Sequence, residues 1–192
     1  MYRNQIMTTL KPAKGVLLVA EPSIIGDVSF NRSVVLLAEY TSKGSVGFIL
    51  NKPLPYKLSD FVPEVNSQLP VFNGGPVEQD NLYFIHCIPE LIPESIEISN
   101  GIYWGGDFSA IAGLLRDDKL NKDQIRFFLG YSGWESEQLE QELEVSSWVV
   151  APNNYNAEII GKTENNFWKE KMLEFGGDYV LWSNAPENPS AN

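Results

Sequence analysis

The sequence predicts an α+β fold in a single domain. Strand-like and helix-like segments are interspersed, yet the turn Thr41–Gly44 joins two apolar runs at a length typical of an antiparallel hairpin. Antiparallel neighbours favour α+β over a doubly wound parallel sheet. The 192 residues, 43% of them hydrophobic, suffice for one substantial core. We therefore expect one domain over residues 15–182, with a polar leader (1–14) and a disordered tail (183–192).

Apolar runs rich in β-branched residues predict three strands near the start of the chain. Gly15–Ala20 is a short buried strand, and Ser33–Tyr40 is a second strand with apolar residues on both faces. Ser45–Leu50 is the return strand of the hairpin. Gly47 within it leaves room for a close backbone approach or a bulge. A short helix is expected near Leu58–Val62.

Turn residues divide the middle of the chain. Asn73–Pro76 contains two glycines that permit positive φ and a proline that fixes the exit from the turn. Asp80–Cys87 is the next strand. Ser95–Ile98 and Ile102–Trp104 are expected to pair through a turn at Asn100-Gly101.

Capping residues and helical periodicity predict two further helices, separated by a last strand at Ser147–Ala151. Asp107 caps the first, which ends at Arg116 and has an inner face of Phe108, Ile111, Ala112 and Leu115. Thr163 caps the second, which ends at Gly176 and carries on one face Trp168, Met172 and Phe175.

The central stretch is predicted to run strand, turn and helix. Ile125–Leu129 is an apolar strand that ends at Gly130. Ser132 then serves as the helix N-cap, and Glu135 three residues later completes a Ser-x-x-Glu capping box. The helix start is therefore expected to be fixed by two reciprocal hydrogen bonds.

The faces of this central helix differ in character. Leu139 and Leu143 form the inward stripe. The opposite face is expected to be a solvated acidic surface made of Glu137, Glu140, Gln141 and Glu144. A shoulder between the two faces follows i, i+4, i+8 spacing and consists of Trp134, Gln138 and Glu142. This shoulder is either a tryptophan at the core edge with two solvated neighbours or part of a binding site.

Composition excludes several functional classes. A formal net charge of −11 and a pI near 4.5 argue against direct nucleic-acid binding, which depends on clustered Lys and Arg. One cysteine, Cys87, and one histidine, His86, exclude an internal disulfide and zinc sites built from several such ligands. No signal-peptide pattern and no apolar run of about 20 residues is present. We expect a soluble, cytoplasmic protein without membrane contact.

Nucleophilic and acid–base chemistry find little support. Adjacent strand residues point to opposite faces, so His86 and Cys87 are not expected to form a dyad. His86 is better interpreted as a core-edge residue with hydrogen-bonded ring nitrogens. Ser33 and Ser132 would need His86 beside them, and no Gly-x-Ser-x-Gly elbow is present. We therefore expect no catalytic residue.

Two ligand-binding alternatives are open. Glu142 with Glu39 or Asp27 could hold a magnesium ion together with several waters. The Asn73–Pro76 turn could present N–H groups to an anion, although it lacks the spacing of a P-loop or a dinucleotide fold. A solvated acidic face and a structural turn account for the same residues, so neither a metal nor a cofactor is expected.

Four ordered motifs carry a family resemblance. Gly130-Tyr-Ser-Gly-Trp134, followed by Gln138-Leu-Glu140 and Glu142, resembles the GYAGWGPGQLExE signature of the AlgH/YqgE family. The other three motifs are, in order, Gly15–Pro22, then Phe30–Glu39 with Gly47–Pro53, and Asn73–Val77. The chain departs from the family at Glu135–Glu137, where Gly-Pro-Gly is usual, and at Tyr40, where many members have His.

The resemblance spans about Gly15 to Tyr179 and implies a mixed, mostly antiparallel, strongly bent sheet that forms a partial barrel with packed helices. It also implies a bacterial protein of unassigned biochemistry with a suggested role in transcriptional regulation. The polar or backbone-exposing positions within the motifs lead us to expect one binding cleft formed by Arg32, Asn51, Gly74, Gly75, Trp134, Gln138 and Glu142.

Two functional classes follow. The first is a non-enzymatic regulatory or interaction protein that binds an unknown protein partner or small-molecule ligand, without direct DNA contact. The second is an enzyme or small-molecule sensor, such as a hydrolase assisted by carboxylates or a metal in the same cleft. The lack of a catalytic constellation in the sequence favours the first.

Overall fold

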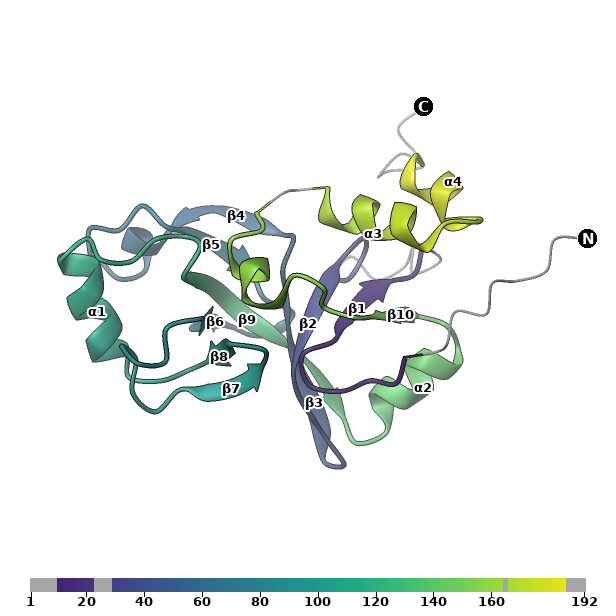
Figure 1. Ribbon diagram of the computed structural model, residues 1–192, viewed down its shortest axis with the longest axis horizontal. Helices are drawn as coiled ribbons and strands as arrows, with labels where there is room; N and C mark the ends of the chain where they lie inside the picture. The colour runs from purple at the N-terminus through teal and green to yellow at the C-terminus, as the bar shows by residue number, and fades with distance from the viewer. Residues whose placement is uncertain (1–9, 23–28, 164–165, 186–192) are drawn as a thin grey trace, which may run out of the picture.

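The structure is a computed structural model that describes residues 10–22, 29–163 and 166–185. Within these residues ten strands form one sheet in the order β10-β1-β2-β3-β9-β6-β8-β7, with β5 beside β9 and β4 beside β5 (Figure 1). The strand bounds are β1 (Leu17–Ala20), β2 (Val34–Thr41), β3 (Gly44–Ile49), β4 (Pro53–Lys57), β5 (Pro70–Asn73), β6 (Val77–His86), β7 (Ile96–Ser99), β8 (Ile102–Trp104), β9 (Ile125–Glu135) and β10 (Trp148–Ala151).

All strand pairs are antiparallel except the parallel pair of β5 and β9. The path of the sheet has two separate ends, β10 and β7, so the described sheet does not close into a barrel. This corrects the partial barrel implied by the resemblance and confirms the α+β class with mostly antiparallel pairing.

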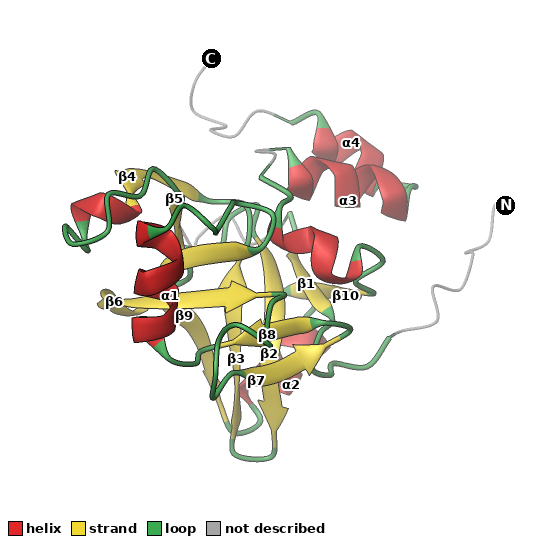
Figure 2. Cartoon of the chain, turned by 60° about the vertical axis from the view of Figure 1, so that its left-hand side comes forward, coloured by secondary structure: helices red, strands yellow, loops and turns green. Residues whose placement is uncertain are grey.

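Short helices cover the sheet. They are α1 (Phe108–Arg116), α2 (Gln138–Glu144), α3 (Phe167–Phe175) and α4 (Tyr179–Ser183), with 3-10 helices η1 (Leu58–Asp60) and η2 (Asn156–Ile160). Figure 1 shows α2 on one side of β1 and β10, with α3 and α4 on the other. Figure 2 shows α1 beside the half of the sheet that contains β6 and β9. The sheet between β10 and β2 is therefore covered on both faces.

Strand β9 joins the two halves of the sheet. Before Gly130 it pairs with β5 and β6, at Tyr131 it still lies opposite Val77 of β6, and from Ser132 onward it pairs with β3. Gly130 has a φ of 68°, and a Cβ atom at this position would lie 2.6 Å from the carbonyl oxygen of Val77. Only glycine fits this crossing, and it lets a single strand change partners without a break.

The predicted helix start at Ser132 is wrong. β9 continues to Glu135, and α2 begins only at Gln138. Ser132 is fully buried, and its hydroxyl donates to the carbonyl oxygen of Gly74 at 3.0 Å instead of capping a helix. Pairing with β3 satisfies the backbone hydrogen bonds of this segment, so the segment forms a strand although its sequence matches a helix-capping pattern.

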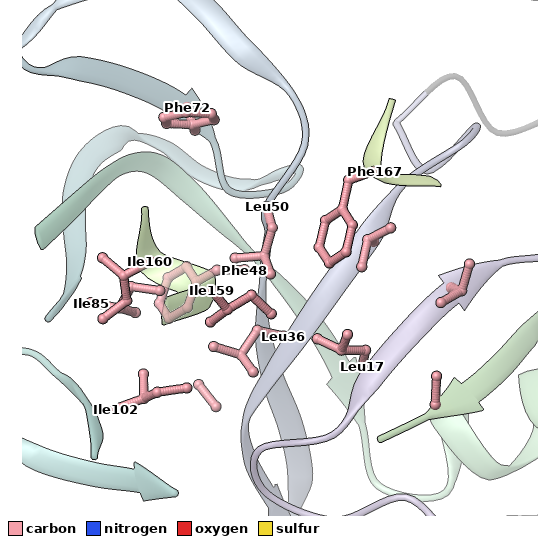
Figure 3. Packing of buried hydrophobic residues seen from close by; sticks show 14 of the residues in the cluster. Leu17, Leu36, Phe48, Leu50, Phe72, Ile85, Ile102, Ile159, Ile160 and Phe167 are labelled. Atoms are coloured by element: carbon pink, nitrogen blue, oxygen red, sulfur yellow. The ribbon is translucent and has the colours of Figure 1, made fainter. Parts of the chain in front are cut away.

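Alternate residues of β2 pack into two different clusters. Val34 and Leu36 belong to the cluster that contains Trp168 of α3, whereas Val35 belongs to the cluster that contains Trp134. Figure 3 shows part of the first cluster, where side chains from strands, η2 and α3 gather, among them Leu17, Leu36, Phe48, Ile159 and Phe167. A third cluster lies between α1 and the β6–β9 half.

Several local predictions are confirmed. Thr41 pairs with Gly44 in the β2–β3 hairpin, and the register shifts by one residue beside Gly47. β7 and β8 pair antiparallel on either side of Asn100-Gly101, whose φ angles are 48° and 79°. The side chain of Asp107 accepts the backbone N–H of Ser109 at 2.8 Å and caps α1. Turn and cap chemistry that is complete within a few residues therefore predicts the structure.

The C-terminal predictions need correction. α3 begins at Phe167 with Asn166 at its N-cap, so Thr163 does not cap this helix. The predicted tail starts too early, because Ser183 is buried and ends α4. Residues 1–9 of the predicted leader and 186–192 of the predicted tail lie outside the described residues. No helix within the described ranges combines the length and apolar character needed to cross a bilayer.

Candidate functional site

Trp134, Gln138 and Glu142 come together as expected, although Trp134 lies on β9 and not on the predicted helix, and Trp148 joins them. One carboxylate oxygen of Glu142 accepts the indole N–H groups of Trp134 and Trp148 at 2.8 and 2.7 Å. Its other oxygen accepts the side-chain amide of Gln138 at 2.9 Å. We call these four residues the Glu142 cluster.

The Glu142 cluster connects three elements. β9 provides Trp134, α2 provides Gln138 and Glu142, and β10 begins with Trp148. The ring of Phe30 lies 6.0 Å from that of Trp134 and 5.2 Å from that of Trp148, so both indoles also pack on one aromatic side chain. Because the two indole donors to Glu142 come from β9 and β10, the arrangement attaches α2 to the sheet.

Arg32 and Asn51 form a separate group. The side chain of Asn51 accepts the N–H of Val34 at 2.8 Å and donates to the carbonyl oxygen of Arg32 at 2.8 Å. The Arg32 guanidinium lies 5.0 Å from the centre of the Trp168 ring and donates to the carbonyl oxygen of Ala185 at 2.7 Å. Trp168 and Trp134 belong to clusters on opposite faces of β2, so the predicted single cleft does not unite Arg32 with the Glu142 cluster.

Gly74 and Gly75 lie at a close crossing of two backbone segments. A Cβ atom on Gly74 would lie 2.1 Å from the carbonyl oxygen of Gly130, and one on Gly75 would lie 2.3 Å from the backbone of Tyr131. The N–H of Gly74 donates to Leu129 at 2.9 Å, and the N–H of Gly75 donates to the side chain of Asn73 at 3.0 Å. Both donors have protein acceptors, which supports the structural turn rather than the anion nest.

The other candidate chemical groups also have structural contacts. The Nδ1 atom of His86 accepts the N–H of Ile88 at 3.3 Å, so Nε2 donates to the Gly105 carbonyl oxygen, also at 3.3 Å. Burial lowers the pKa of His86 and raises that of the Cys87 thiol. The hydroxyl of Ser33 donates to the carbonyl oxygen of Phe30 at 2.8 Å. His86 thus has both ring nitrogens hydrogen-bonded, as the sequence predicts, but it is fully buried instead of lying at the core edge.

The acidic residues do not gather into a metal-binding group. Among the residues that the structure describes, no three His, Cys, Asp or Glu side chains lie close enough together to hold an ion. Asp27, one of the suggested ligands, lies outside the described residues. Glu140 is not simply solvated as predicted, because it accepts the hydroxyl of Tyr40 at 2.6 Å. This hydrogen bond raises the pKa of Tyr40.

Arg126 is an unusual residue that the sequence does not single out. It is 2% exposed, and its guanidinium donates to the carbonyl oxygens of Leu50 at 2.8 Å and Lys162 at 2.5 Å. It also lies 4.6 Å from the centre of the Phe72 ring, while its Nε atom is buried without a hydrogen-bond partner. Burial lowers the pKa of Arg126 to about 9. The residue ties β9 to two loops.

Two surface grooves adjoin α2. The first, of about 570 Å³, includes Trp134, Gln138, Tyr131, Glu39 and Lys43 among its lining residues, and we call it the Trp134 groove. The second, of about 550 Å³, runs beside β10 and is lined by Leu10, Lys11, Pro12, Glu21, Leu143, Glu144, Ser146, Trp148, Val149, Val150 and Tyr179. We call this second groove the β10 groove. Of the polar residues in the four sequence motifs, Glu21 lines this groove.

Strand β10 presents an open edge in the β10 groove. The N–H of Ala20 donates to Ser33, which precedes β2, whereas that of Glu21 donates to Ser147, which precedes β10, so alternate residues along β1 face β10. In this register Val149 lies opposite Val19, so the N–H and C=O of Val149 point toward β1, whereas those of Val150 point away from β1. In the described part of the chain β10 pairs with β1 alone, so the outward N–H and C=O of Val150 have no strand partner.

Comparison with known proteins identifies the family of this chain. The model of the family described as AlgH-like (DUF179) matches residues 17–180. UPF0301 proteins of Bacteroides fragilis and Bacteroides thetaiotaomicron are 42% and 40% identical to this chain, each covering 94% of it and 92% of the relative.

Two solved structures share the fold. Protein DIP2367 of Corynebacterium diphtheriae matches with a TM-score of 0.72 at 22% identity, covering 93% of this chain and 95% of that one. The solution structure of the AlgH protein of Pseudomonas aeruginosa matches with a TM-score of 0.69 at 20% identity, covering 97% and 98%. The four motifs, the open mostly antiparallel sheet and the family model lead to one conclusion: this chain belongs to the AlgH-like family.

Proposed function

We propose that this protein is a non-enzymatic interaction protein that binds an extended segment of a partner protein along the edge of β10. The observation that carries the proposal is the outward-facing backbone of Val150, which opens onto a groove of about 550 Å³. An unpaired strand edge with side-chain pockets beside it is the geometry used when a peptide adds a strand to a sheet.

The surroundings of this edge support binding of a peptide rather than protection of the edge. Natural sheets shield open edges with charged residues, proline or a covering element. The groove contains Lys11, Pro12, Glu21 and Glu144, but the edge strand itself has no charged residue or proline. It contributes Val149 and Val150, and Leu143 of α2 and Tyr179 of α4 line the groove beside them. Val145, next to the groove at the end of α2, is 74% exposed. Exposed apolar side chains beside an unpaired edge are typical of a binding surface.

A regulatory role fits this proposal without direct contact to DNA. The chain has a net charge of −11, so a phosphate backbone would be repelled at most of its surface. Any influence on transcription would then pass through a bound protein. The candidate catalytic groups, His86 and Ser132, are engaged in structural hydrogen bonds, which supports a non-enzymatic role.

The test uses three capped eight-residue peptides in which valine alternates with lysine, threonine or glutamate. At least one should bind and shift the backbone amide signals of Trp148 and Val150 in NMR titrations. Val150→Pro should abolish this binding, because it removes the outward N–H while leaving the hydrogen bonds to β1 in place. Lack of Val150→Pro-sensitive binding by all three peptides would overturn the proposed function.

A second candidate function is a small-molecule sensor or enzyme that uses the Trp134 groove. Its volume of about 570 Å³ is in the range of ligand pockets, and Trp134 and Gln138 line it. A thermal-shift screen against metals, nucleotides and metabolites tests this candidate, since a ligand at a hundredfold excess over its Kd adds about 2.7 kcal/mol. The shift should disappear in Gln138→Ala and persist in Glu158→Ala, which lies outside the groove.

A further inference from the structure

We infer, on the basis of the proposed function, that the segment bound along β10 is basic and alternates Lys or Arg with apolar residues. The partner is thus a protein with an extended, positively charged segment, rather than a second copy of this chain. Charge, side-chain direction and the two walls of the β10 groove each contribute to this inference.

The α2 wall of the β10 groove lies in a stretch of the chain that lacks basic residues, and Glu144 of this stretch lines the groove. Between Arg126 and Lys162 there is neither lysine nor arginine, whereas the same stretch carries six glutamates, at positions 135, 137, 140, 142, 144 and 158. This stretch builds the end of β9, all of α2 and all of β10. A long acidic stretch next to an open strand edge attracts cationic segments and repels anionic ones.

The walls of the groove assign the two faces of the bound segment. Val150 packs on the same face of the sheet as α2, whereas Val149 packs on the opposite face. Residues of an added strand would alternate in the same way. The α2 wall carries Glu144, which is exposed. The other wall carries Tyr179, whose pKa is raised by burial and by the nearby charge of Glu21, and Glu21 already has a contact of its own within the protein. Basic side chains therefore belong on the α2 face and apolar side chains on the Tyr179 face.

A second copy fits the groove less well. Antiparallel pairing of two β10 strands would bring two chains of net charge −11 together and place their α2 helices near each other. Lys11 is the one cationic residue among those that line the groove, against Glu21 and Glu144. Like charges facing each other across an interface oppose association, so a basic partner is the better complement.

The experiment compares the same three peptides with this protein and with charge variants. In low salt we expect the lysine–valine peptide to bind about tenfold or more tightly than the glutamate–valine peptide, and about 0.5 M salt should reduce this difference strongly. Glu144→Lys should weaken binding of the lysine peptide several-fold. Glu158→Lys carries the same charge change outside the groove and should have a much smaller effect.

Each outcome decides a different claim. Equal binding of lysine and glutamate peptides, lost in Val150→Pro, would overturn the basic partner while the proposed function stands. No Val150→Pro-sensitive binding of any peptide would overturn both. Sedimentation should give a monomer for the protein and for Val150→Pro. A dimer that Val150→Pro converts to a monomer would identify a second copy as the occupant and would also overturn the basic partner.

Discussion

The Glu142 cluster and the edge of β10 meet at Trp148 but differ in how their polar groups are satisfied. In the cluster, Glu142 receives three hydrogen bonds from Trp134, Gln138 and Trp148. Two residues away, the outward backbone of Val150 has no strand partner among the described residues. The difference indicates that the motif around Trp134 and Glu142 has a structural role, because it attaches α2 to the sheet. The backbone groups without a strand partner lie instead on β10, which belongs to none of the four motifs.

The largest expected effect comes from comparing two proline substitutions in β10. Val149→Pro removes an N–H that faces β1 and should destabilise the protein by about 3 kcal/mol. Val150→Pro removes an N–H that faces away and should cost about 1 kcal/mol or less. Urea unfolding of both variants measures the contrast. Equal losses would mean that β10 is not an open edge.

The next largest effect should follow from Glu142→Ala. Trp134 and Trp148 are 4% and 5% exposed, so the substitution leaves two buried indole N–H groups without an acceptor. Each such group costs roughly 1–3 kcal/mol, and we expect a total loss of about 2–3 kcal/mol. Glu142→Gln keeps an oxygen acceptor and should lose less. Equilibrium unfolding checks both, and an unchanged Glu142→Ala midpoint would contradict the structural role.

A smaller loss is expected from Gly74→Ala. The new Cβ atom would lie 2.1 Å from the carbonyl oxygen of Gly130, and backbone must move to relieve the overlap. Overpacking of this kind costs about 2 kcal/mol. Gly113→Ala is the matched control, because nothing lies within 4 Å of its Cβ position in α1 and alanine favours helix. Thermal melts should move in opposite directions, and parallel shifts would rule out the close crossing.

The smallest effect concerns pH and His86. Because burial lowers the folded-state pKa, the unfolded chain binds the proton first as the pH falls. The contribution of neutral His86 is therefore complete above its unfolded pKa of about 6.5 and is lost as the pH falls toward the folded value. Stability measured from pH 8 to pH 5 should fall more steeply for the protein than for His86→Gln. Identical slopes would show that His86 does not titrate differently on folding.

The success of prediction depended on where the relevant partners lie. The hairpin at Thr41–Gly44 and the cap at Asp107 involve residues two or three positions apart, and both are found as expected. The capping box predicted at Ser132 is just as local, yet the Ser132 hydroxyl donates its hydrogen bond to the carbonyl oxygen of Gly74, 58 positions away. Helical spacing brought Gln138 and Glu142 together correctly, but nothing in that spacing indicates Trp148.

The sequence by itself determined the family, the α+β class, most strands, the exclusion of an internal disulfide and the acidic character of the chain. Each follows from composition, periodicity or motif order, which are properties of the chain alone. Tertiary structure decided that residues 132–135 pair with β3 instead of starting a helix. It also decided that Arg32 packs on Trp168, on one face of β2, and that β10 is the last strand of the sheet. These outcomes depend on contacts between residues far apart in sequence, where a better-satisfied distant partner outweighs a local preference.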